Sequence, residues 1–207
     1  SEIRYTTDGS EPDESSPLYT GPFTLNLPSG SPVVLKSRTF MPNGRKSAVH
    51  EGVFEKLEWQ LSVDAAEVES GLNFQYFEKE ILNVDEINGN PDKKGIIENI
   101  IFPDNAADNF FAVVYDGFIK VPEKAVYDFN LSTSSGKGVL MIGNMNVVDN
   151  TAELPRYYQR TGKIALEEGF HRFRLTYLTT IHKAGLKLEC TFNDKRVEDI
   201  PASWFFH

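Results

Sequence analysis

Two segments near the end of the chain alternate apolar and polar residues with a period of two. The first covers residues 172–177 (RFRLTY) and the second residues 186–192 (LKLECTF). Successive side chains of a β-strand point to opposite faces, so this period predicts antiparallel strands with one face in a core and the other in water. An α-helix, with its period of 3.6 residues, is excluded for both segments.

Other short apolar stretches recur along the chain between clusters of Gly, Pro, Asn and Asp, and no long stretch has a helical period. This pattern predicts an all-β chain that folds as a sandwich or a barrel. In the middle of the chain, residues 127–131 and 139–142 are expected to pair as two antiparallel strands around an exposed polar loop at residues 134–138. Binding residues are often carried by such loops, so this loop and the next one at residues 143–146 are candidate sites.

The composition narrows the possible partners. Of the 207 residues, 40% are hydrophobic, which is enough for real cores, and the net charge is −9 with Lys and Arg scattered along the chain. Nucleic acid and anionic membranes are therefore not expected as partners. No apolar run approaches the roughly 20 residues that span a bilayer. The single cysteine, Cys190, cannot form an internal disulfide and is predicted to be a buried core residue.

The chain divides into two parts by its turn signals and composition. Residues 1–56 are predicted to form a small β-module, in which Asn43-Gly44 joins two strands as a hairpin. Residues 57–70 are Glu-rich and are predicted to be a linker, with Trp59 either packed at the joint or stacked on a sugar ring. Residues 71–207 form the larger domain. The chain begins within a predicted strand and without a methionine, so we expect it to be a piece of a longer protein.

Sequence blocks in the first part carry a resemblance to a known family. They are YTTDGSEP at residues 5–12, SPLYTGPF at residues 16–23, and residues 34–40 and 44–47. These blocks resemble the chitobiase and β-hexosaminidase C-terminal domain, also called the fibronectin-III-associated module. The resemblance implies an immunoglobulin-like β-module that is attached to secreted glycoside hydrolases and that is incomplete here by about one strand.

The larger domain resembles a second family. The matching blocks lie at residues 71–78, 111–122, 125–129, 136–143, 147–150 and 162–175. They are similar to the anthrax-protective-antigen-type domain, an antiparallel β-sandwich of bacterial glycosidases, yeast adhesins and toxins whose lectin members bind glycans. In calcium-dependent members, two adjacent aspartates precede the apolar strand. Ser134 and Ser135 stand at those positions, and because neutral hydroxyls are weak calcium ligands, neither calcium nor another cofactor is expected.

Polar and aromatic residues around the predicted loops form a candidate carbohydrate-binding site. Its members are Ser134, Ser135, Asn144, Asn146, Asp149, Asn150, Tyr157 and Tyr158. Such a set could hydrogen-bond sugar hydroxyls and stack on a pyranose ring. The alternative is that these are ordinary turn residues, which loops favour for backbone reasons.

Catalytic signatures have little support in the sequence. The histidines at positions 50, 171, 182 and 207 are dispersed without zinc-like spacing, and no G-x-S-x-G elbow or phosphate-binding loop occurs. Together with the two resemblances, this predicts a non-catalytic C-terminal region of a secreted, periplasmic or cell-surface bacterial glycoside hydrolase similar to family-twenty β-hexosaminidases. Its expected partners are an upstream catalytic domain and glycans that contain N-acetylhexosamine. The alternative is a structural module that packs on or spaces the catalytic domain and binds no sugar.

Overall fold

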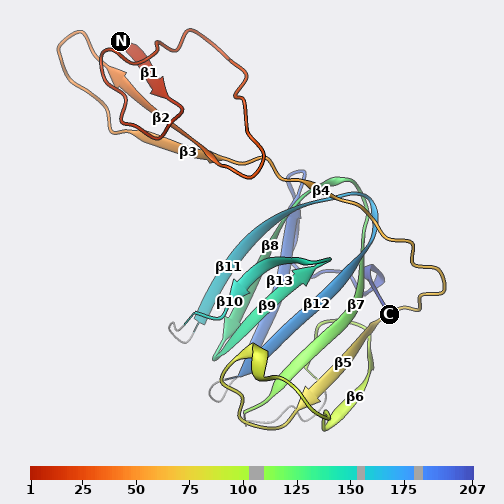
Figure 1. Ribbon diagram of the computed structural model, residues 1–207. Coiled ribbons are helices and arrows are strands. Elements are labelled where there is room, and N and C mark those ends of the chain that lie inside the picture. The colour runs from red at the N-terminus through yellow and green to blue at the C-terminus, as the bar shows by residue number, and fades with distance from the viewer. Residues whose placement is uncertain (103–109, 153–156, 180–183) are drawn as a thin grey trace. The chain divides into compact units, whose positions relative to one another are not determined.

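The computed structural model describes residues 1–102, 110–152, 157–179 and 184–207 (Figure 1). The chain forms two compact units, Ser1–Glu58 and Trp59–His207. The described residues are almost entirely strands and connecting loops. Their only helical elements are two short 3-10 turns, η1 (Val84–Glu86) and η2 (Ala202–Trp204), so the predicted all-β class is confirmed. None of the described helical turns has the length and hydropathy needed to cross a bilayer.

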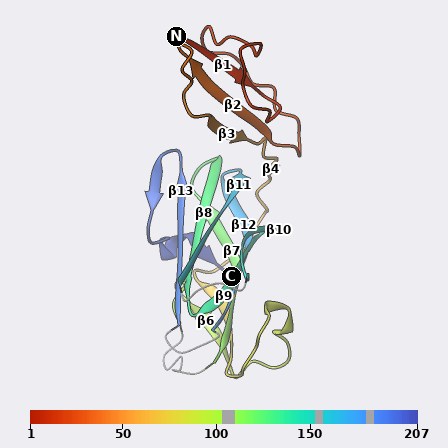
Figure 2. The ribbon, with the colours of Figure 1, turned by 90° about the vertical axis from the view of Figure 1, so that its left-hand side faces the viewer.

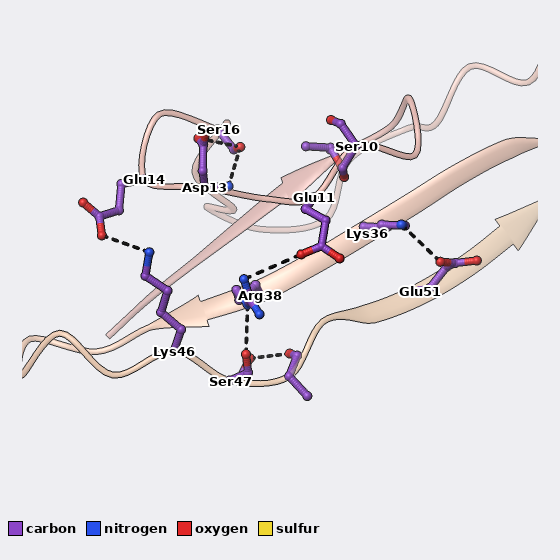
Figure 3. Close-up of polar contacts among 12 residues, drawn as sticks. Ser10, Glu11, Asp13, Glu14, Ser16, Lys36, Arg38, Lys46, Ser47 and Glu51 are labelled. Atoms are coloured by element: carbon purple, nitrogen blue, oxygen red, sulfur yellow. Dashed lines mark hydrogen bonds and ion pairs between the residues drawn. The ribbon is translucent and has the colours of Figure 1, made fainter.

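The first unit is one antiparallel sheet in the order β1-β2-β3. Its strands are β1 (Glu2–Thr6), β2 (Val33–Phe40) and β3 (His50–Phe54). The predicted hairpin is confirmed, because β2 pairs with β3 and Gly44 adopts the positive φ of +78° that a tight turn needs. One face of this sheet is charged. On it, Arg38 lies 3.8 Å from the Glu11 carboxylate and donates to the Ser47 carbonyl at 2.9 Å (Figure 3).

The opposite face of the first unit is apolar and half-exposed. By strand register this face carries Ile3, Tyr5 and Phe54, and the Phe23 ring stacks on Tyr5 with centroids 4.7 Å apart. Ile3, Phe23 and Phe54 keep 42%, 45% and 43% of their surface exposed. Residues 1–58 are all described, and Pro12 is their only buried residue. The first unit therefore has a sheet without a covering layer.

The second unit contains two sheets, which are antiparallel except for one short parallel pair. The seven-stranded sheet has the order β10-β9-β12-β7-β5-β6, with β15 beside β7. Its strands are β5 (Leu72–Phe77), β6 (Lys93–Ile97), β7 (Ala112–Val121), β9 (Gly136–Ile142), β10 (Met145–Asn150), β12 (Gly169–Thr179) and β15 (Phe205–Phe206).

The five-stranded sheet has the order β14-β13-β8-β11-β4. Its strands are β4 (Trp59–Gln60), β8 (Ala125–Ser134), β11 (Tyr157–Leu166), β13 (Gly185–Phe192) and β14 (Lys195–Val197). Figure 2 shows β8 and β13 side by side in this sheet. The short β4 pairs with β11 in parallel, so the segment predicted as a linker pairs with the second unit from Trp59 onward.

The main core lies between the two sheets and is built from alternate residues of each strand. β8 contributes Tyr127, Phe129 and Leu131, each 0% exposed, and Tyr177 of β12 is also fully buried. The predicted alternation at residues 172–177 and 186–192 is confirmed, but the two strands β12 and β13 lie in different sheets. Alternation of apolar and polar residues indicates which face of a strand is buried, but it does not indicate which strand is its hydrogen-bonded neighbour.

The predicted pairing of residues 127–131 with 139–142 is wrong. β8 belongs to the five-stranded sheet and β9 to the seven-stranded sheet, so Ser134, Ser135 and Gly136 carry the chain across from one sheet to the other. Of the glycines that suggested a loop, Gly136 is the first residue of β9 and Gly138 lies inside it. A Cβ atom at Gly136 would overlap the Leu178 carbonyl oxygen, and one at Gly138 would lie 3.0 Å from the Leu131 side chain. These positions require glycine because of close packing.

A second, smaller apolar cluster covers part of the outer face of the seven-stranded sheet. The outward-facing side chains of Phe77, Val114 and Leu178 pack with Ile81, and Val84 and Ile87 from the loop around η1 lie against them. The η1 loop therefore covers one end of this outer face. The stretch of the face beyond Gln75, which is the register partner of Val114, is not part of this cluster.

Candidate functional site

Two buried side chains of β12 form hydrogen bonds to the backbone of the crossover between the sheets, which is residues 134–136. The Tyr177 hydroxyl donates to the Ser134 carbonyl at 2.9 Å and accepts the Gly185 N–H at 3.3 Å. The Thr179 hydroxyl donates to the Ser135 carbonyl at 3.0 Å. Burial raises the pKa of Tyr177 to about 12, so the phenol stays protonated and remains a donor at physiological pH. The crossover is thus a fixed part of the sandwich.

Ser134 lies on the outer face of the five-stranded sheet, between its register partners Gly185 of β13 and Tyr157 of β11. A Cβ atom at Gly185 would overlap the Ser134 hydroxyl, so that hydroxyl occupies the space that a side chain at position 185 would need. Ser135 follows with a φ of +57°, in the left-handed region. Tyr158 is the register partner of Thr133, which places both predicted tyrosines at the crossover end of β11.

Asp149 and Asn150 also lie at this end, but their side chains have local partners. Asn150 is 1% exposed, and its amide donates to the Thr133 hydroxyl at 3.0 Å, which in turn donates to the Gly136 carbonyl at 3.0 Å. The Asn150 amide therefore supports the crossover from inside the domain. Asp149 is exposed, and its carboxylate accepts the Thr151 N–H at 3.0 Å.

The two remaining candidates lie at the opposite end of the sandwich. Asn144 follows β9 in the turn to β10, and Asn146 of β10 pairs with Met141 near the end of β9. β9 has seven residues, and at about 3.3 Å per residue the turn lies roughly 20 Å from Ser135. The predicted residues therefore form no single site. Ser134, Ser135, Asp149, Asn150, Tyr157 and Tyr158 form one group, called the crossover end below, and Asn144 and Asn146 lie apart from it.

The crossover end does not fit a calcium ion. Calcium takes six to eight oxygen ligands, with carboxylates supplying the charge. The positions of the two family aspartates hold serines, and the Asp149 carboxylate caps its own turn at Thr151. Within residues 1–102, 110–152, 157–179 and 184–207, no three His, Cys, Asp or Glu side chains form a group suited to a metal ion.

The described histidine and cysteine at the centre of the second unit have structural roles. His171 is 3% exposed, and its Nε2 atom lies 2.8 Å from the Glu167 carbonyl oxygen. Burial lowers the pKa of this imidazole. Cys190 is 1% exposed, which confirms the predicted core position, and burial raises the pKa of its thiol to about 12. His182 lies outside the described residues.

Sequence reasoning missed a hollow on the outer face of the seven-stranded sheet. It has a volume of about 590 Å³ and is lined by side chains from β5, β6, β7 and β12 that are far apart in the sequence, among them Asn73, Lys94, Asp116 and Arg174. Each of these strands alone has the ordinary pattern of polar residues facing solvent. Only the order of the strands in the sheet brings these polar groups together.

Two mainly antiparallel sheets packed face to face around one core define the second unit as a β-sandwich domain. Its sequence matches the PA14 domain over residues 69–204, and the chain belongs to this family. Residues 1–51 match the chitobiase/beta-hexosaminidase C-terminal domain. Both resemblances predicted from the sequence, and their order along the chain, are thereby confirmed.

A curated relative extends the match over both units. A beta-hexosaminidase of Porphyromonas gingivalis is 24% identical over 188 residues, covering 86% of this chain and 23% of the relative. The chain thus spans about a quarter of the length of that enzyme.

Solved structures share the fold at low identity. The PA14 sugar-binding domain from an RTX adhesin has a TM-score of 0.54 at 15% identity, covering 67% of this chain and 98% of that one. The epithelial adhesin 9 A domain from Candida glabrata, solved with Galβ1-3GlcNAc, has a TM-score of 0.52 at 12% identity, with coverages of 70% and 92%. An anti-sigma factor domain-containing protein has a TM-score of 0.58 at 17% identity, with coverages of 99% and 75%.

Proposed function

We propose that this chain is a non-catalytic accessory region of a larger secreted bacterial glycoside hydrolase, and that its PA14 domain binds glycans that contain N-acetylhexosamine. The observation that carries the proposal is the match to a beta-hexosaminidase, which covers 86% of the chain and so extends over both units. Sugar-binding relatives with the same fold support it. The catalytic domain would then be a partner within the same protein, and the accessory region would keep it close to its substrate.

The crossover end is the surface that we assign to glycan recognition. Its backbone is fixed by the Tyr177 and Thr179 hydroxyls, so binding a sugar there requires little ordering of the protein. By strand register Tyr157 lies beside Ser134 on the outer face and Tyr158 beside the buried Thr133. We therefore assign the contact with a pyranose ring to Tyr157, and contacts with sugar hydroxyls to the Ser134 hydroxyl and the Asp149 carboxylate. None of these groups requires a bound cation.

Because the predicted residues lie at two ends of the sandwich, variants at one end can be compared with variants at the other to test glycan binding. The full chain is titrated with chitotriose by isothermal titration calorimetry, in parallel with the double variant Tyr157→Ala/Tyr158→Ala. The matched control is Asn144→Ala/Asn146→Ala, which truncates two exposed residues roughly 20 Å away. We expect at least a tenfold loss of affinity in the tyrosine variant and less than a twofold loss in the control. The reverse order, or no binding by the unmodified chain, would contradict the proposal.

One observation favours a second, structural function for the first unit. Its apolar face, which includes Ile3, Phe23 and Phe54, is about half-exposed and has no covering layer within residues 1–58. Exposed apolar surface of this kind is typical of a packing interface. A structural function predicts that the parent enzyme loses thermal stability or turnover when the accessory region is removed. Equal stability and turnover of the parent enzyme with and without the accessory region would exclude this structural function.

A further inference from the structure

The outer face of the seven-stranded sheet carries a polar groove away from the crossover end. In the strand register, one row of outward-facing residues crosses five neighbouring strands, and it consists of Ile96, Asn73, Asp116, Arg174 and Met141. At about 4.8 Å between strands this row is about 19 Å long. Because the groove lies on paired strands, its side chains are presented by a rigid floor.

Two hollows make up this groove. The larger has a volume of about 590 Å³, within the range of roughly 300–1,000 Å³ typical of ligand sites. The smaller, of about 130 Å³, is lined by Met141, Gly143 and Arg172 among others. Both hollows include Asp116 and Arg174, whose side chains form an ion pair at 3.0 Å. The two hollows therefore meet at this ion pair.

Several polar groups in the groove have no partner among the described residues. Asn73, Gln75 and Lys94 are exposed, and none of them forms a side-chain hydrogen bond or ion pair with another described residue. Arg172 is also exposed, and among the described residues its guanidinium contacts only the Phe118 ring, in a cation–π contact 5.8 Å from the ring centroid. Two amides and two cations are thus available to a ligand on one rigid surface.

The charge of the groove is opposite to that of the chain. Three cations, Lys94, Arg172 and Arg174, line the two hollows against the single carboxylate of Asp116. The whole chain has a net charge of −9. A local excess of positive charge on an acidic protein attracts an anionic ligand, and guanidinium groups bind carboxylates and sulfates with charge-assisted hydrogen bonds.

We propose that this groove is a second glycan-binding site, selective for sugar chains that carry acidic groups such as uronates. Lys94 and Arg172 bind the acidic groups, and the Asn73 and Gln75 amides bind neighbouring hydroxyls. The exposed Ile96, which keeps 57% of its surface accessible, contacts the apolar face of a sugar ring. The proposal rests on the carbohydrate-binding function proposed above but uses a different surface, so each can fail without the other.

The test compares two probes of equal length on the full chain. A hyaluronan hexasaccharide alternates N-acetylglucosamine with glucuronate, and chitohexaose has the same number of rings without charge. Binding of both probes is measured by calorimetry at 50 mM and 300 mM NaCl. At 50 mM NaCl, hyaluronan should bind at least tenfold more tightly than chitohexaose, and its affinity should fall steeply at 300 mM NaCl. The variant Lys94→Gln/Arg172→Gln should lose at least tenfold in hyaluronan affinity and bind chitohexaose unchanged.

The matched control is Lys163→Gln/Lys195→Gln, which removes two cations, 65% and 62% exposed, from the five-stranded sheet. Hyaluronan affinity should change less than twofold in this control. The inference would be overturned if both variants lost the same hyaluronan affinity, or if poly-glutamate bound as tightly as hyaluronan. It would also be overturned if hyaluronan did not bind at all. If chitohexaose then still bound at the crossover end, the proposed function would stand. Hyaluronan binding at the groove without any binding of neutral glycan would support the groove and contradict the crossover end as a glycan site.

Discussion

Replacing Tyr177 by phenylalanine tests whether the crossover depends on the hydrogen bonds beneath it. The phenol is fully buried and serves two backbone groups, the Ser134 carbonyl at 2.9 Å and the Gly185 N–H at 3.3 Å. A hydrogen bond contributes about 1 kcal/mol to stability, so Tyr177→Phe should lower the free energy of unfolding by about 2 kcal/mol. For a domain of about 150 residues this corresponds to a Tm lower by about 6 °C.

Urea unfolding followed by tryptophan fluorescence is the suitable assay. The chain has two tryptophans, Trp59 and Trp204, and both lie in the second unit, so the signal reports on the PA14 domain alone. Tyr127→Phe is the matched control, because Tyr127 is equally buried and its hydroxyl donates one hydrogen bond of 2.8 Å, to the Glu123 carbonyl. We expect a loss of about 1 kcal/mol in this control. A loss in Tyr177→Phe no larger than in Tyr127→Phe would show that the crossover does not depend on the second bond.

Three further predictions concern other parts of the PA14 domain. Burial holds the pKa of His171 below its ordinary value of 6.5, so the unfolded chain takes up the proton first as the pH falls. The urea midpoint should therefore decrease from pH 7.5 to pH 5.5, and less so in His171→Gln; equal decreases would contradict this. With its pKa raised to about 12, Cys190 should not react with a thiol reagent at pH 8 until urea unfolds the domain, and rapid reaction without urea would show an accessible thiol. In Gly162→Ala the new Cβ would overlap the Val147 carbonyl of β10, so the variant should be less stable by about 1–3 kcal/mol or more in the same urea assay, and an unchanged midpoint would exclude this close contact.

Local patterns in the sequence predicted the strands and their buried faces well. The alternation around Phe173, Leu175 and Tyr177 identified β12 and its core face, because burial of one face imposes a period of two. The Asn43-Gly44 pair identified the β2–β3 hairpin, because few residues other than glycine adopt the backbone that such a turn needs. These features depend only on neighbouring residues.

Which strands pair could not be read from the same patterns. Gly136 and Gly138 suggested a loop, but they belong to β9, where side chains at these positions would collide with Leu178 and Leu131. Glycine in a strand and glycine in a turn look alike in a sequence, although the first reflects tertiary packing and the second local backbone geometry.

The candidate site was predicted as one cluster and is divided by the length of β9. Residues 134–150 are close in sequence, but a strand of seven residues separates the crossover from the Asn144 turn. In the groove on the seven-stranded sheet, by contrast, residues far apart in the sequence lie close together. Asn73 and Arg174 are about 100 positions apart and come together only through the order β12-β7-β5.

Carbohydrate recognition by this region is best tested on a glycan array probed with the full chain, with and without EDTA. We predict that the chain binds glycans that contain N-acetylhexosamine and that the chelator leaves the signals unchanged, because the crossover end presents serines where calcium-binding relatives carry aspartates. Loss of the signals in EDTA would show that a cation is required. An array on which no such glycan retains the chain would contradict the proposal that this region recognises carbohydrate.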